Sequence, residues 1–154
     1  GATFSLAGVS VDASAVELNM AADNSANCEV VTATNAITAA ESGKTFFLAS
    51  ATEFLSTLPA PALGLRYKFI VALAPSGASY TIATNGSANI IIGGINELEV
   101  DDTEDGPYSA VGDLISFVDA VAVVGDWCEV ISDGTSWFLT GQTNADGGVT
   151  IAST

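Results

Sequence analysis

The chain has 154 residues, of which 49% are hydrophobic, and it carries 18 acidic side chains against 3 basic ones, for a formal net charge of −15. Such a surface repels phosphate backbones and anionic lipids, and three cations cannot supply the counterion release that drives nucleic-acid binding. We therefore expect neither nucleic acid nor membrane as a partner. No stretch approaches the ~20 consecutive apolar residues of a membrane helix, and the first residues lack a signal-peptide pattern.

The absence of histidine removes the commonest general base and the usual partner of a serine or cysteine nucleophile. We therefore expect a non-enzymatic protein. Cys28 and Cys128 form no CxxC pair, and each lies in an apolar, strand-like run. Two small buried hydrophobic side chains are the favoured interpretation, and a disulfide would require their Cα atoms to lie within about 7 Å.

The first 25 residues are expected to form an extended N-terminal arm or a short helix. The one helical pattern in the chain covers residues 13–22. The remainder, residues 26–154, shows no composition break and is predicted to be a single β domain.

Strand signals follow at the short spacing of a sandwich or barrel. Residues 65–71 alternate most clearly, with Arg66 and Lys68 on one face and apolar side chains on the other. The predicted strands cover residues 28–34, 45–48, 52–58, 65–71, 79–84, 89–93, 113–118, 121–124, 126–131, 136–141 and 149–151.

Turn signals lie between several of these strands, among them residues 41–44, Asn85-Gly86 and Asp133-Gly134. Asn-Gly and Asp-Gly pairs favour tight hairpins. Because the pattern contains no crossover helices, it predicts antiparallel pairing. The expected fold is therefore all-β: an antiparallel β-sandwich, jelly-roll-like or a partly open barrel, with an extended N-terminal arm.

The segment from residue 97 to 107 is acidic and is predicted to be a loop. Asp101, Thr103 and Asp105 place oxygen ligands at alternate positions before Gly106, as in an EF-hand, but Gly112 falls where the bidentate ligand is needed. A solvated acidic loop is the favoured interpretation. The alternative is a Ca²⁺ site that adds ligands from Glu97, Glu99 and Asp113. No other cofactor is expected.

Two further groups of residues invite a functional interpretation. Glu97 and Glu99, two apart on a strand, would place carboxylates some 7 Å apart, near the range of an inverting glycosidase, but any acidic strand does this by chance. Trp127 and Trp137 flank the Asp133-Gly134 turn. We expect both indoles to be largely buried rather than to form an aromatic ligand platform.

Four segments carry a resemblance to a known group of proteins: residues 43–48, residues 56–59 with 64–70, residues 87–94, and residues 125–139. Together they resemble virion structural proteins of tailed bacteriophages. The pattern is similar to a β-domain of capsid decoration (cement) proteins and of tail-fibre or tailspike-associated proteins, and it spans residues 41–141. No catalytic motif comes with it.

The resemblance implies a homotrimer on the capsid exterior that binds the major capsid protein and stabilises the assembled shell. The N-terminal stretch would supply partner contacts through Ala2, Thr3, Phe4, Leu6 and Val9. The alternatives are a receptor-binding tail-fibre or adaptor domain, which virion copy number would distinguish, and a secreted carbohydrate-binding module, which would need an exposed aromatic platform.

Overall fold

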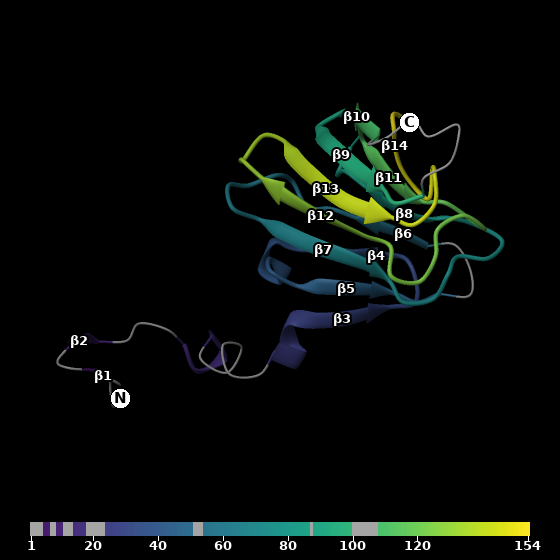
Figure 1. Ribbon diagram of the computed structural model, residues 1–154. Helices are drawn as coiled ribbons and strands as arrows, with labels where there is room; N and C mark the ends of the chain where they lie inside the picture. The colour runs from purple at the N-terminus through teal and green to yellow at the C-terminus, as the bar shows by residue number, and fades with distance from the viewer. Residues whose placement is uncertain are drawn as a thin grey trace.

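A computed structural model describes residues 5–6, 9–10, 14–17, 24–50, 54–86, 88–99 and 108–154. The described part is predominantly β, and its strands form two mixed sheets in a sandwich-like arrangement (Figure 1). No helix in it is long and apolar enough to cross a membrane. The larger sheet has seven strands: β3 (Cys28–Val31), β5 (Thr45–Leu48), β7 (Arg66–Val71), β9 (Ile91–Glu97), β10 (Tyr108–Gly112), β12 (Trp127–Ser132) and β13 (Trp137–Thr143).

The second sheet has five strands: β4 (Asn35–Ala36), β6 (Phe54–Thr57), β8 (Tyr80–Ala83), β11 (Leu114–Phe117) and β14 (Val149–Ala152). The strand order is β10-β9-β13-β12-β7-β5-β3 in the first sheet and β14-β11-β8-β6-β4 in the second. Two short 3₁₀ helices, η1 (Asn24–Asn27) and η2 (Ala39–Glu41), precede β3 and β5. β1 (Ser5–Leu6) and β2 (Val9–Ser10) pair with each other and lie apart from both sheets in Figure 1.

The expectation of a purely antiparallel fold is wrong. Among the ten strand pairings described within the two sheets, five are antiparallel and five are parallel. The reason lies in the chain path, because from β3 to β9 each successive strand joins the opposite sheet. Parallel neighbours need a long crossover, usually a helix. Here a strand of the other sheet makes the crossover, so parallel pairing arises without helices.

Alternation of side chains builds the core between the sheets. In β7 the buried residues are Tyr67, Phe69 and Val71, while Arg66 and Lys68 face the other side, as the sequence predicts. Phe46 stacks on Phe69 with ring centroids 5.4 Å apart. Burying each such side chain contributes roughly 1.5–3 kcal/mol to folding. One hydrophobic cluster includes side chains from both sheets, which is what holds the layers together.

The three named turn signals are confirmed as turns, but only one of them makes a hairpin. Asp133-Gly134 joins β12 to its antiparallel neighbour β13, and Asp133 Oδ1 accepts hydrogen bonds from the backbone N–H groups of Thr135 and Ser136, each at 2.8 Å. Gly86 has the positive φ that its turn requires, yet β8 and β9 lie in different sheets. The turn at residues 41–44 likewise leads from β4 to β5, across the layers.

Three local predictions need correction or completion. Residues 121–124 form turns rather than a strand, and the acidic segment predicted as a loop contains the end of β9. β10 was not predicted. Of the helix expected over residues 13–22, the described residues show a helical turn at 15–17. It begins with a capping box, in which Ser14 N–H donates to Glu17 Oε2 at 2.6 Å and Glu17 N–H donates to Ser14 Oγ at 3.2 Å.

Candidate functional site

Most of the residues proposed from the sequence as metal or partner contacts lie outside the described part of the chain. These are Asp101, Thr103 and Asp105, and Ala2, Thr3 and Phe4. Leu6 and Val9 are opposite one another in the β1–β2 pair. Within the described ranges, no three His, Cys, Asp or Glu side chains are grouped as a metal ion would need.

The additional Ca²⁺ ligands proposed from the sequence do not all come together, because Asp113 lies far from Glu97. Gly112 lies opposite Ile91 at the start of β9, whereas Glu97 ends that strand. At about 3.3 Å per residue, this puts Asp113 and Glu97 roughly 20 Å apart. Asp113 is buried and accepts hydrogen bonds from Thr154 N–H at 2.9 Å and from Thr154 Oγ1 at 2.8 Å. Its carboxylate therefore anchors the last residues of the chain.

The two cysteines lie on opposite sides of the seven-stranded sheet. Cys128 is fully buried in β12, and burial, with the neighbouring Glu129 charge, raises the pKa of its thiol far above the ordinary value. Cys28 is exposed on β3, and neither cysteine forms a disulfide. The prediction of two buried cysteines is thus correct only for Cys128.

The outer face of the seven-stranded sheet, turned away from the core, carries large apolar side chains. Val111 pairs with Ile92, Ile92 pairs with Phe138, and Phe138 pairs with Ile131 across four adjacent strands. These four residues, the first apolar row, are 55%, 37%, 45% and 48% exposed in that order. A solvated outer sheet face is normally polar, so a continuous apolar row marks a surface suited to contact another molecule.

A second apolar row crosses the other half of the same face. It consists of Trp127, Ile70, Phe47 and Val30, which are paired in that order across β12, β7, β5 and β3. The first three are partly exposed and Val30 is 63% exposed. Trp137, by contrast, is fully buried on the inner side. The expectation that both indoles are largely buried is confirmed for Trp137, whereas Trp127 is partly exposed on the outer face.

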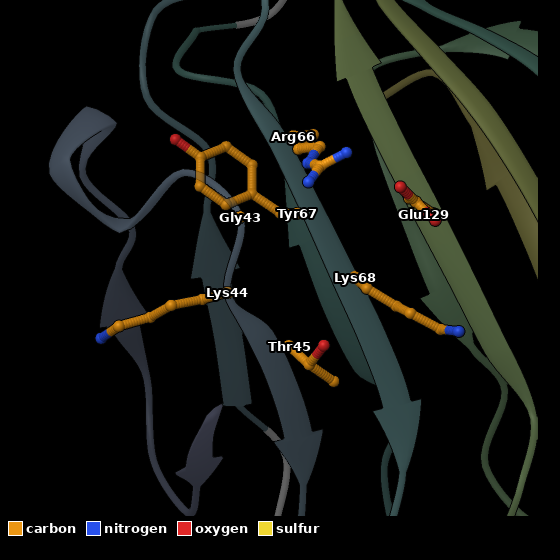
Figure 2. A pocket seen from close by; sticks show the side chains of 7 residues that line it. All are labelled: Gly43, Lys44, Thr45, Arg66, Tyr67, Lys68 and Glu129. Atoms are coloured by element: carbon orange, nitrogen blue, oxygen red, sulfur yellow. The ribbon is translucent and has the colours of Figure 1, made fainter. Parts of the chain in front are cut away.

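A polar row of Thr140, Glu129, Lys68 and Thr45 lies between the two apolar rows. The ammonium of Lys68 lies 4.5 Å from the centroid of the Trp127 ring, a cation–π contact. Beside this row is an open hollow of about 230 Å³. Figure 2 shows its lining: Gly43, Lys44, Thr45, Arg66, Tyr67, Lys68 and Glu129.

All three cations of the chain line this hollow. They do not converge on a single point, because Lys44 and Lys68 extend in opposite directions (Figure 2). Arg66 is exposed and lies next to Ile131 at the end of the first apolar row. The lysines and the arginine of this strongly acidic protein therefore gather at the outer face, where Glu129 also lies.

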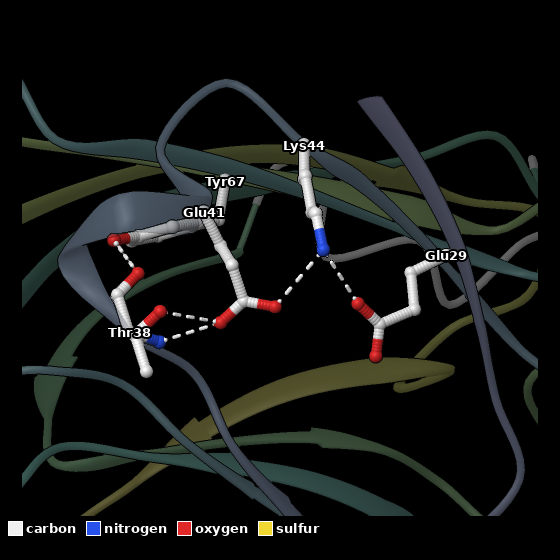
Figure 3. Close-up of polar contacts among 5 residues, drawn as sticks. All are labelled: Glu29, Thr38, Glu41, Lys44 and Tyr67. Atoms are coloured by element: carbon white, nitrogen blue, oxygen red, sulfur yellow. Dashed lines mark hydrogen bonds and ion pairs between the residues drawn. The ribbon is translucent and has the colours of Figure 1, made fainter. Parts of the chain in front are cut away.

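Lys44 is engaged at the border of this face by a polar network (Figure 3). Its Nζ donates to Glu29 Oε2 at 2.8 Å and to Glu41 Oε1 at 3.0 Å. The bond to Glu29 is the main reason that the pKa of Lys44 is raised, although burial opposes it. Burial would raise the pKa of Glu41, but hydrogen bonds from Thr38 and Lys44 lower it on balance. Among the described residues, Arg66 and Lys68 therefore form no ion pair with a carboxylate, and Lys68 contacts the Trp127 ring instead.

One end of the seven-stranded sheet combines carboxylates with exposed apolar side chains. Asp126 is buried there and ties two turns together, because it accepts hydrogen bonds from Val123 N–H and Asn144 N–H, both at 2.9 Å. Glu97 accepts from Gly147 N–H at 2.8 Å. We call this surface the acidic end; it comprises Leu73, Glu97, Leu98, Glu99, Val123, Val124 and Asp146.

The carboxylates proposed from the sequence as a catalytic pair belong to this acidic end. Glu99 Oε2 accepts from Asp146 N–H at 3.3 Å, so both Glu97 and Glu99 hold the turn that follows β13. This gives the two side chains a structural role in the turn.

Comparison with models of protein families, with curated proteins and with solved structures found no match to this chain. Sequence alone placed Arg66 and Lys68 on one face. It did not reveal the apolar rows, because each row joins residues from four strands whose order is fixed only in the folded sheet.

Proposed function

We propose that this chain is a non-enzymatic structural protein that decorates the outside of a tailed-bacteriophage capsid and stabilises the assembled shell. The observation that carries the proposal is the outer face of the seven-stranded sheet, where the first apolar row is between 37% and 55% exposed. A domain that acted alone in water would carry polar side chains at these positions. The resemblance of residues 41–141 to decoration proteins gives the kind of assembly.

The N-terminal stretch is proposed to be an extended arm that contacts the major capsid protein through Ala2, Thr3, Phe4, Leu6 and Val9. The position of β1 and β2 apart from both sheets (Figure 1) supports this division of roles. Binding the assembled shell more tightly than separated subunits would stabilise the shell by mass action. A homotrimeric state, implied by the resemblance, belongs to the same proposal.

Shell melting tests this function directly. The purified chain is added to shells of the major capsid protein encoded in the same genome, prepared without the decoration protein, and both samples are heated. We expect the shell to melt at a higher temperature when the chain is present, and a Phe4→Ser variant to lose most of the shift. An unchanged shell melting temperature with the wild-type chain would contradict the proposal.

The alternatives make different predictions. A tail-fibre or adaptor domain would be present in a few to tens of copies per virion, whereas a shell component would be present in hundreds, which quantitative mass spectrometry of virions can measure. A carbohydrate-binding module would stack a sugar on Trp127. The Lys68 ammonium covers that ring at 4.5 Å, which favours a structural role for the indole.

A further inference from the structure

The charge of the molecule is unevenly distributed in a way that constrains how two copies can meet. Every lysine and arginine of the chain lines one hollow on the seven-stranded sheet, while the formal net charge is −15. Any contact that leaves this region out therefore joins two surfaces that carry no lysine or arginine. Only a contact that includes the outer face brings opposite charges together.

A face-to-face pairing is disfavoured by the same distribution. It would bring Arg66 and Lys68 of both copies into one interface, since an isologous contact uses the same patch on each copy. The outer face instead needs a surface that is both apolar and acidic. The acidic end of the same chain fits, because Leu98 and Val124 are 50% and 60% exposed there beside Glu97 and Glu99.

We infer that copies of this chain associate head to tail, with the outer face of the seven-stranded sheet of one copy against the acidic end of the next. The two apolar rows cover Leu73, Leu98, Val123 and Val124 of the neighbour, and Arg66 and Lys68 meet its carboxylates. Such a heterologous contact leaves one outer face and one acidic end unoccupied on every dimer. It therefore continues until a ring closes, which permits a trimer.

The inference deepens the proposed function by naming how copies pair within the decoration layer. The inference and the proposed function can fail separately. Self-association is measured on the purified chain without capsid, whereas shell melting measures the capsid role. Binding of a monomeric chain to shells would overturn the inference and keep the function, and an oligomer without effect on shells would do the reverse.

The decisive experiment uses two charge-reversal variants of the full chain, analysed by sedimentation velocity. Arg66→Glu with Lys68→Glu makes the outer face acidic, and Glu97→Lys with Glu99→Lys makes the end basic. Each variant alone is expected to be monomeric at concentrations where the wild type associates. An equimolar mixture is expected to associate again, because the reversed face of one variant meets the reversed end of the other.

Several results would overturn the inference. One is a wild-type chain that stays monomeric throughout, and another is a mixture of folded variants that fails to associate. Continued association of the Glu97→Lys, Glu99→Lys variant alone would indicate face-to-face pairing or an unrelated contact. Far-UV circular dichroism and melting establish that each variant is folded.

A second pair of variants tests the same contact while leaving Glu97 and Glu99, and the turn that they hold, unchanged. Phe138→Ser on the outer face and Val124→Ser on the acidic end each remove apolar contact and are expected to weaken association at least about tenfold. Leu63→Ser is the matched control, because Leu63 is 83% exposed but belongs to neither surface. Equal effects of all three substitutions would contradict the inference.

Discussion

The two sheets enclose one core, but their outer faces carry different side chains. On the five-stranded sheet, Thr150, Ser116, Thr81 and Leu55 form one cross-strand row. The second row there is mostly alanine, with one threonine and one leucine: Ala152, Leu114, Ala83, Thr57 and Ala36. On the seven-stranded sheet the corresponding positions carry Phe, Trp, Ile and Val, together with Arg66 and Lys68.

This difference separates the side chains that folding requires from those that it does not require. The inner residues of both sheets are almost fully buried, so each sheet has enough apolar surface to form the core. Short Thr, Ser and Ala side chains on the five-stranded face suit a surface that remains in water. The large apolar side chains of the other face add nothing to the core, which points to contact with a partner.

Thiol labelling is the most sensitive test of which side of the seven-stranded sheet is buried and which is exposed to solvent. Cys28 is exposed, whereas Cys128 is buried with a raised thiol pKa. We expect Cys28 to react at once, and Cys128 to react at least about a thousandfold more slowly, because it must wait for unfolding. Mass spectrometry of the labelled native protein measures both rates. Comparable labelling rates of the two thiols would show that the inner side of the sheet is accessible to the reagent.

Adjacent substitutions in β7 compare the inner and outer sides of the sheet directly. Phe69→Ala removes a fully buried ring and is expected to lower the free energy of unfolding by about 3–5 kcal/mol. Ile70→Thr gives the outer face the character of the five-stranded one and is expected to cost less than about 1.5 kcal/mol. Denaturant unfolding in dilute solution measures both. Equal costs would mean that the outer row belongs to the core of the monomer.

Glu41→Gln tests whether the network around Lys44 stabilises the border of the outer face. The folded-state pKa of Glu41 is lowered from its ordinary value of 4.5, so its contribution is present above that pH and is lost as the pH falls through the lowered pKa. We expect the variant to lose about 1 kcal/mol at neutral pH. Thermal melts should show a smaller difference from wild type at about pH 3. A constant difference would contradict this.

The smallest effect is expected for the cation–π contact on the outer face. Lys68→Met removes the ammonium that lies 4.5 Å from the Trp127 ring and should cost about 0.5 kcal/mol, with a change in tryptophan fluorescence. Thr81→Val, at a partly exposed outer position of the five-stranded sheet, provides the comparison and should leave that fluorescence unchanged. No change for Lys68→Met would mean that the ammonium does not stay over the ring.

Sequence patterns predicted well those features that depend on neighbours along the chain. The alternation in β7 correctly separates Tyr67 and Phe69 from Arg66 and Lys68, since a strand turns successive side chains to opposite faces. The Asp133-Gly134 turn correctly joins two antiparallel strands. A local turn signal at Asn85-Gly86 also gives a turn, but it does not determine which strand lies beside β8.

The sequence by itself therefore determined the β character of the chain, the inner and outer residues of its clearest strands, and its strong negative charge. Only the tertiary structure decided which strands are neighbours, because parallel pairing depends on contacts between residues that are distant along the chain. The candidate surface depends on that order, since Val111, Ile92, Phe138 and Ile131 become one row only when four strands take their places in the sheet.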